Sequence, residues 1–170
     1  MRKQIIAFII GLLILPAAVL ILALLGLLPF YATAIPSKLE TNIAVKSLHA
    51  SIKGKTSEIK NPLVASEEVL LSGLKMYRSN CAGCHGDYQQ PSPWGTKNFY
   101  PRVPQFGMQA SNLTSEEMYV VVKNGVRYSG MASWNGLISN TEIWRIVTFL
   151  SHINSLPTNV DQAWKKKQQS

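Results

Sequence analysis

The sequence predicts an all-α protein in which one membrane-spanning helix precedes a small helical domain. Two observations carry this prediction. Residues 5–30 form an uncharged, mainly apolar run. Three later segments, residues 66–80, 114–124 and 139–156, place apolar side chains at the spacing of a helix face and open on capping residues. No segment shows the alternation of apolar and polar residues that marks a half-buried strand.

The N-terminal run is long enough to cross a bilayer, because about 20 helical residues span the hydrocarbon core. Arg2 and Lys3 precede it, which predicts a cytoplasmic N-terminus and export of everything that follows. A cleaved signal peptide is the alternative, since residues 32–34 (Ala-Thr-Ala) resemble a cleavage site. The apolar stretch of a signal peptide is shorter, about 7–15 residues. We therefore predict that residues 1–34 form a signal anchor. It crosses the cytoplasmic membrane and leaves the later domain on the periplasmic side.

Residues 35–65 are predicted to link this anchor to the domain. Two prolines interrupt the segment and five lysines are spread along it. Part of it has amphipathic helical spacing, so it either lies along the membrane surface or packs on the domain. The compact domain is expected over residues 66–157. Residues 158–170 include the basic run 165–167 and are expected to form a solvated tail, with a docking or lipid-contact patch as the alternative.

The first helix of the domain is predicted over residues 66–80. Ser66 can cap its N-terminus, and the two glutamates that follow suit its first turn. From residue 89 to residue 109 the chain holds four prolines and two glycines, which exclude a long regular element. Residues 89–109 are therefore expected to form a loop.

The second and third helices carry clear start and stop signals. Thr114 can cap the second helix, with Glu117 at the capping-box position, and Gly125 follows its last turn. Ser139 or the residue after it begins the third helix, and Pro157 closes it. Three helices and two loops are therefore expected in the domain.

The chemistry of the chain concentrates in Cys81-Ala82-Gly83-Cys84-His85, directly after the first helix. Cys-x-x-Cys-His is the attachment signature of a c-type haem, in which each thiol bonds one vinyl group and the histidine ligates the iron. The chain contains only two cysteines, so both are committed to this motif. The sequence therefore predicts one haem c, attached covalently through Cys81 and Cys84, with His85 as its proximal iron ligand.

Other uses of a Cys-x-x-Cys pair are a redox-active dithiol, a structural disulfide and half of a zinc site. A thioredoxin-type site would follow a strand in a βαβ pattern, and none precedes Cys81. A structural zinc usually needs four protein ligands, and the sequence holds no second Cys-x-x-Cys and no His-x-x-x-His. None of these alternatives needs the adjacent His85, so we favour haem attachment.

The other face of the iron needs a second ligand. Haem in electron-transfer proteins is commonly ligated by histidine and methionine, and the thioether raises the reduction potential. The candidates are Met76, Met108, Met118 and Met131, with His49 and His152 as alternatives. Met131 lies beyond a whole predicted helix from the motif, and its small neighbours Gly130 and Ala132 let the backbone approach a porphyrin face. We favour Met131, while Met108, a histidine or an open site remain alternatives.

With these features together, the domain from Ser66 to Leu156 resembles a class I cytochrome c. The haem motif and the Gly-x-x-x-Tyr before it resemble the first helix and attachment site of that family. The distal loop resembles the family pattern Asn-Gly…Gly-Met-Pro-x-Trp, with alanine at the proline position, and the last helix resembles the C-terminal helix of the family. The residues that carry the resemblance are Gly73, Tyr77, Cys81, Cys84, His85, Asn124, Gly125, Val126, Gly130, Met131, Ala132, Trp134, Ile143, Trp144, Phe149 and Leu150.

The resemblance implies a cytochrome c fold of three to four helices around one covalent haem. It also implies that the first and last helices cross at close range, at Gly73. In the family, a proline carbonyl in the loop after the motif accepts the Nδ1 proton of the proximal histidine. Pro104 fits that position best in this sequence, with Pro101 as the runner-up, and the iron ligands are then His85 and Met131.

The sequence predicts an electron carrier and not an enzyme. Our leading hypothesis is a membrane-anchored periplasmic cytochrome that carries single electrons between respiratory partners through a His/Met-ligated haem. The alternative is a fixed haem c subunit of a larger membrane oxidase, reductase or dehydrogenase complex. A haem enzyme or ligand sensor with an open sixth position is a third hypothesis, which requires that Met131 does not bind the iron.

The expected partners follow from the same features. Residues 5–30 would contact the lipid bilayer, and other redox proteins would exchange electrons with the haem. The net charge is +8, and the exported part, without Arg2 and Lys3, would carry +6. Such a basic surface suits steering toward acidic partners as well as simple solubility. Nucleic acid binding is not expected, because no recognised fold signature is present. The sequence offers no catalytic dyad that would point to a small-molecule substrate.

Overall fold

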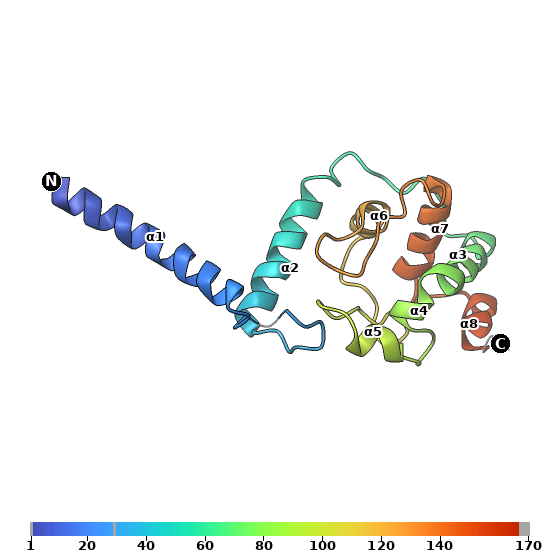
Figure 1. The fold of residues 1–170 in the computed structure, drawn as a ribbon. Coiled ribbons are helices and arrows are strands. Elements are labelled where there is room, and N and C mark those ends of the chain that lie inside the picture. The colour runs from blue at the N-terminus through green and yellow to red at the C-terminus, as the bar shows by residue number, and fades with distance from the viewer. Residues whose placement is uncertain (1, 29, 167–170) are drawn as a thin grey trace. The chain divides into compact units, whose positions relative to one another are not determined.

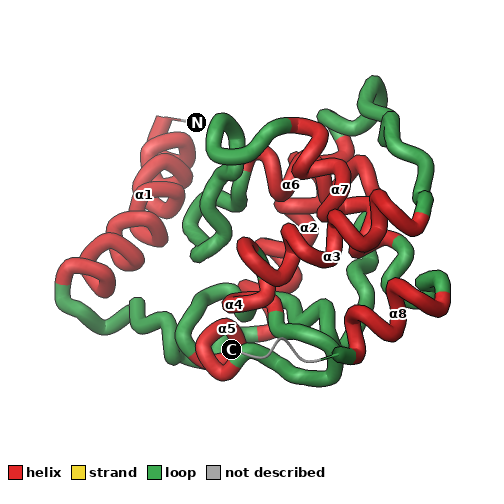
Figure 2. Tube along the Cα trace, turned by 90° about the vertical axis from the view of Figure 1, so that its right-hand side faces the viewer, coloured by secondary structure: helices red, strands yellow, loops and turns green. Residues whose placement is uncertain are grey.

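Helices are the only regular elements in the described residues of the computed structural model, which are residues 2–28 and 30–166 (Figure 2). Two residue pairs form isolated β-bridges, and these described ranges form no sheet. The predicted all-α fold class is therefore confirmed. The chain divides into two compact units, residues 1–34 and 35–170, which we describe one at a time.

The first unit contains helix α1, Arg2–Leu24, which is 23 residues long. Its mean hydropathy is 3.1 over an 18-residue window, and none of that window is buried. A helix that is apolar all round is typical of a membrane span. α1 is long and apolar enough to cross a bilayer, and a signal sequence satisfies the same criteria. Met1 and Pro29, which fall within the predicted anchor, lie outside the described residues.

The second unit contains the remaining helices of the described residues (Figure 1). They are α2 Lys38–Lys53, α3 Glu67–Asn80, α4 Ala82–His85, α5 Pro93–Lys97, α6 Ser115–Asn124, α7 Asn140–Ser151 and α8 Thr158–Lys165. The predicted caps are confirmed, because the side chains of Ser66, Thr114 and Ser139 each accept a hydrogen bond from the backbone N–H three residues on. These caps determine where α3, α6 and α7 begin.

Helices α3 and α7 cross with their backbones in contact at Gly73. A Cβ atom at Gly73 would overlap the carbonyl oxygen of Arg145 and lie 2.8 Å from the Cβ of Phe149, so only glycine fits. Beside this crossing, the centroids of the buried rings of Tyr77 and Phe149 lie 5.8 Å apart. The close crossing that the resemblance implies is thus present, and it places Cys81, at the end of α3, beside a rigid core.

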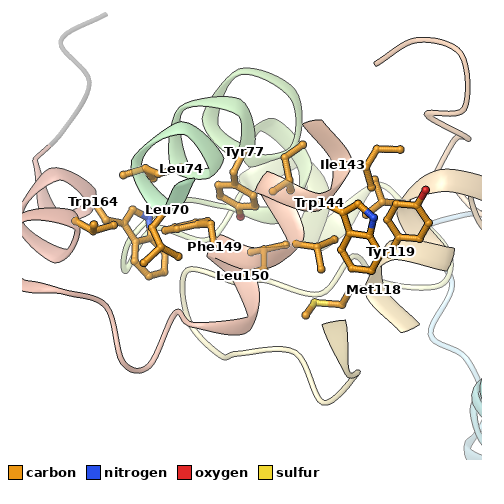
Figure 3. Packing of buried hydrophobic residues seen from close by; sticks show 14 residues of the cluster. Leu70, Leu74, Tyr77, Met118, Tyr119, Ile143, Trp144, Phe149, Leu150 and Trp164 are labelled. Atoms are coloured by element: carbon orange, nitrogen blue, oxygen red, sulfur yellow. The ribbon is translucent and has the colours of Figure 1, made fainter. Parts of the chain in front are cut away.

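Aromatic contacts extend the core on both sides of the crossing (Figure 3). Towards α6, the ring of Tyr119 stacks on Trp144, with centroids 4.1 Å apart and an interplanar angle of 10°. Towards α8, the indole of Trp164 packs edge-on against Phe149, with centroids 5.2 Å apart. A continuous row of buried side chains therefore joins α8, α3, α7 and α6.

Residues 158–165 differ from the sequence prediction. They form helix α8 in place of a solvated tail, and Val160 and Trp164 on one face of it are buried. These two side chains are one helical turn apart, a pattern too short to stand out beside a lysine run. The prediction of a solvated tail is wrong for this helix, while Lys167 and residues 168–170 lie outside the described residues.

The predicted linker, residues 35–65, also packs on the domain in part. Helix α2 buries Ile52 and contacts α6. Further along, the Asn61 side chain donates a 2.9 Å hydrogen bond to the Thr148 hydroxyl on α7. The second half of the linker thus packs on the domain, one of the two arrangements that the sequence allows. The boundaries of anchor, linker, domain and tail stay predictions.

Candidate functional site

The Cys-x-x-Cys-His motif turns sharply out of α3. Cys81 forms the C-terminal cap of α3, and residues 82–85 form a single further turn, α4. The N–H groups of Cys84 and His85 donate to the Cys81 carbonyl at 3.1 and 2.9 Å. Because Cys84 lies one turn after Cys81, both thiols project from neighbouring positions on the same side. Gly86 then ends the turn with φ +75°.

The Cys81 thiol lacks the lowered pKa that a redox-active dithiol needs. Both cysteines are partly exposed and neither forms a disulfide bond. Burial raises the pKa of the Cys81 thiol to about 12, and the neighbouring Cys84 adds to the rise. Disulfide exchange depends on a lowered thiol pKa, so Cys81 suits a permanent covalent attachment better than a redox cycle. Within residues 2–28 and 30–166, no three His, Cys, Asp or Glu side chains form a group able to hold a metal ion.

The ring of His85 is held by the loop that follows the motif. Its Nδ1 atom lies 2.9 Å from the carbonyl oxygen of Pro104, and its ring stacks on Phe106 with centroids 4.7 Å apart. A carbonyl oxygen only accepts, so Nδ1 carries the proton and Nε2 keeps its lone pair. Burial lowers the pKa of His85, which favours the neutral imidazole that ligates metals. The resemblance implies this contact, and the roles of both residues stay predictions.

Two polar side chains tie the same loop to the backbone of the motif. The amide nitrogen of Gln105 donates to the Cys84 carbonyl at 3.1 Å, and its oxygen accepts from the Ser92 N–H at 2.7 Å. The Ser92 hydroxyl, which is buried, donates to the Gly83 carbonyl at 2.6 Å. Side-chain contacts to distant carbonyls follow no periodicity or spacing, so no sequence signal identifies Gln105 or Ser92 as part of the site.

A second network fixes the turn just after His85. Asp87 accepts from the Arg78 guanidinium at 2.9 Å and from the Trp164 indole N–H at 2.7 Å. Arg78 also donates to two carbonyl oxygens of α8, at 3.1 and 2.5 Å. Helices α3 and α8 together therefore hold the segment that leaves the motif. No motif or spacing in the sequence identifies Arg78 or Trp164 as part of this arrangement.

Met131 lies between α6 and α7, and its side chain is partly buried against the core. The Ser129 hydroxyl accepts from the Met131 N–H at 3.1 Å and closes the loop by donating to a carbonyl three residues earlier at 2.7 Å. Gly125 opens the loop at φ +70°, where a Cβ would lie 2.7 Å from the Met131 carbonyl oxygen. The ring of Phe99 packs so closely on Gly130 that a Cβ there would overlap it. These contacts hold a loop in which alanine replaces the proline of the family pattern.

The other candidate distal ligands lie in different surroundings. Met118 is buried on the inner face of α6, and Met76 packs against the outside of the core. Met108 is 59% exposed. His49 is exposed on α2, and Nδ1 of His152 lies 2.9 Å from a carbonyl oxygen one turn earlier in α7. Of the four methionines, only Met131 combines partial burial with a place in a loop that follows a domain helix.

Comparison with protein families concerns the central part of the second unit. Residues 68–150 match the family described as Cytochrome C oxidase, cbb3-type, subunit III. This stretch is a class I c-type cytochrome domain. It runs from the first turn of α3 to the end of α7, so α1, α2 and α8 lie outside it. Comparison with curated proteins and comparison with solved structures each gave no match.

The cytochrome domain contains the donors that covalent haem c requires. Two thiols lie on one turn, and the Nε2 lone pair of His85 is kept available because Nδ1 is engaged by Pro104. A thioether, that of Met131, sits in the loop that matches the distal part of the family pattern. The residues present therefore fit haem c, and the domain supports haem-based electron transfer, as a carrier or as part of an oxidase.

Proposed function

We propose that this chain is a membrane-anchored cytochrome that carries single electrons between redox partners on the periplasmic side of the cytoplasmic membrane. The observation that carries the proposal is the His85 ring, fixed through Nδ1 by Pro104 and adjacent to two thiols within a cytochrome domain. Haem c, when bound there, supplies an iron that changes between Fe(II) and Fe(III). One haem is expected, because the chain has one attachment motif.

Five residues are proposed to hold this group. Cys81 and Cys84 provide its two covalent attachments, and His85 and Met131 ligate the iron. Pro104 orients the His85 ring by accepting its Nδ1 proton, which also makes the imidazole a stronger ligand. The ring stacking and loop contacts described above restrict both ligands before any electron arrives. Little of the site then has to rearrange during transfer.

A fixed place in a larger complex is the second candidate function. It is favoured by the family match, because the family description names a subunit of an oxidase. Co-purification separates the two functions. A tagged, detergent-solubilised chain that keeps an oxidase, reductase or dehydrogenase at a constant ratio through a salt wash is a subunit. A chain that elutes alone and still exchanges electrons with membranes is a carrier.

The proposal also includes retention of residues 1–34 as the anchor. The apolar run is longer than the apolar stretch of a signal peptide, about 7–15 residues, and α1 has the length of a membrane span. Residues 35–65 would then connect the anchor to the haem domain at 66–157, to which α8 adds a further helix. An intact mass that contains residues 1–34 supports retention, and a mature chain that starts after Ala34 contradicts it.

The first test is the visible and near-infrared absorption spectrum of the chain purified from a host that attaches haem. The reduced wild type should show a sharp low-spin α-band, and the oxidised wild type a weak near-infrared sulfur-to-iron band. Met131→Ala should abolish the near-infrared band, whereas Met108→Ala, the matched control in an exposed loop, should retain it. A high-spin wild type contradicts the ligand assignment and favours the enzyme or sensor hypothesis. A band that survives Met131→Ala also contradicts the assignment, and means that another methionine supplies the sulfur ligand.

A further inference from the structure

Helix α2 has two apolar faces, and the domain covers only one of them. Ile52 is 4% exposed and Leu48 is partly buried, on the side that packs towards α6. Leu39 and Ile43 are 70% and 56% exposed. Successive residues of a helix turn by about 100°, so Leu39 and Ile43 lie on the side of α2 opposite to Leu48 and Ile52. The described residues of the second unit leave this outer face open.

The charges on α2 favour an anionic surface against this outer face. Lys46 and Lys53 lie beside Leu39 and Ile43 around the helix, and both lysines are exposed. The single acid of the helix is Glu40, and its side chain is hydrogen-bonded to Tyr100. Apolar side chains bordered by lysines are typical of a helix that lies in the interface of a membrane.

Helix α2 follows α1 closely along the chain, so the membrane that α1 would cross lies within reach of this face. Only residues 25–37 separate the end of α1 from the start of α2. A fully extended chain gains at most about 3.5 Å per residue, so α2 begins within about 45 Å of the end of the apolar helix. Phe30 and Tyr31 in this connection are 76% and 80% exposed, and aromatic residues are enriched where a span meets the lipid headgroups. A tether this short raises the effective concentration of α2 at the surface.

We propose that Leu39, Ile43, Lys46 and Lys53 form a lipid-binding face that lies on anionic headgroups of the membrane crossed by α1. Leu39 and Ile43 insert below the headgroups, while the two lysines contact lipid phosphates. This inference rests on the proposed retention of α1. Because the opposite face of α2 packs on α6, the helix that leads into the Met131 loop, contact with lipid orients the haem domain relative to the membrane.

The test is a depth measurement on the full-length chain in vesicles. Ile43→Cys is compared with Thr41→Cys, whose side chain is also exposed but lies on the other side of the helix. Each variant carries a polarity-sensitive fluorophore on the added cysteine, in vesicles with an anionic lipid and with or without a headgroup nitroxide lipid. The ratio of emission with and without nitroxide is the readout, since any quenching by haem cancels in that ratio.

The expected result is a blue-shifted label at position 43 that the nitroxide quenches at least twofold more than the label at position 41. In zwitterionic vesicles, or with Lys46→Gln and Lys53→Gln together, the excess quenching at position 43 should fall. Equal quenching at positions 43 and 41 overturns the proposal, and means that solvent or a protein partner meets this face.

Controls separate this inference from the proposed function. A chain that does not float with the vesicles contradicts the retained anchor, and with it the lipid contact. Wild type should take up no fluorophore, because Cys81 and Cys84 carry the haem. Labelling of the wild type would contradict only the haem attachment. The difference in quenching between positions 43 and 41 above that background would still decide the lipid contact.

Discussion

The two helices that flank the cytochrome domain, α2 and α8, are attached to it in different ways. α8 has half as many residues as α2, yet it buries Val160 and Trp164 and receives two hydrogen bonds from Arg78. α2 buries Ile52 alone and leaves the large apolar side chains of its N-terminal half exposed. Specific contacts, and not helix length, therefore decide which flank belongs to the core.

The difference extends to the haem site. Trp164 donates a hydrogen bond to Asp87, two residues after His85. Helix α8 therefore contacts the segment that leaves the motif directly. Among the described helices α2 contacts α6 alone, and its Glu40 is hydrogen-bonded to Tyr100 in the loop before α6. α8 is accordingly a structural part of the electron-transfer domain, while α2 is free to meet something outside it.

The largest effect is expected for Trp164→Ala. Truncation of a buried tryptophan costs about 3–5 kcal/mol in the free energy of unfolding, and here it also removes a hydrogen bond to Asp87. Trp164→Phe is the control, because it keeps an aromatic ring against Phe149; it loses the hydrogen bond to the Asp87 carboxylate and part of the buried ring, and should cost about 2 kcal/mol. Guanidinium titration of the haem-loaded full chain in detergent measures the free energy of unfolding of both variants. A loss below about 1 kcal/mol for Trp164→Ala would mean that α8 is detached in solution.

The next effect concerns the ion pair that joins α3 to the same turn. The side chains of Arg78 and Asp87 are 9% and 29% exposed, so Arg78→Gln leaves a poorly hydrated carboxylate with fewer partners. We expect a loss of about 2 kcal/mol, in the range for hydrogen bonds to charged groups. A double-mutant cycle with Asp87→Asn, followed by the same titration, should give a coupling free energy of about 1 kcal/mol or more. Additive single effects would show that the ion pair does not stabilise the turn after the motif.

The contrast between the flanks also shows where sequence reasoning works. The caps at Ser66, Thr114 and Ser139 are local signals, and the helices begin where those signals stand. The haem motif is local as well, because all of its chemistry lies within one turn. A helix or site encoded by neighbouring residues can be recognised from spacing alone.

Contacts between distant residues set the limit of such reasoning. α8 has no capping side chain and only two buried residues, so its signal is too weak without knowledge of the aromatic core that it joins. Gln105 meets the Cys84 carbonyl across 21 positions, and no pattern encodes that approach. For Pro104, spacing left a second proline open, and it was the likeness to a known family that favoured the residue now seen 2.9 Å from Nδ1 of His85.

A smaller effect is expected on the α2 side. Ile52→Ala should lower the free energy of unfolding by about 2 kcal/mol, the low end for a buried isoleucine, because α2 has no other buried side chain to hold it in place and can shift to close the cavity. Val45→Ala, at a site that is 48% exposed, is the control and should change stability by less than about 0.5 kcal/mol. If Ile52→Ala matched Trp164→Ala, the two flanks would be equally part of the core and the contrast would fail.

The smallest effect should come from Leu39→Ser and Ile43→Ser together. Both side chains are exposed, so in detergent the free energy of unfolding should change by less than about 0.5 kcal/mol. The same double variant should lose the blue shift of a label at position 46, introduced as Lys46→Cys, when the chain is in anionic vesicles. Destabilisation in detergent comparable to that of Ile52→Ala would place both side chains against the protein itself. The expected combination is an unchanged free energy of unfolding in detergent and a lost blue shift on anionic vesicles. Only a membrane-facing helix produces it, because the two side chains then matter solely where there is a bilayer for them to enter.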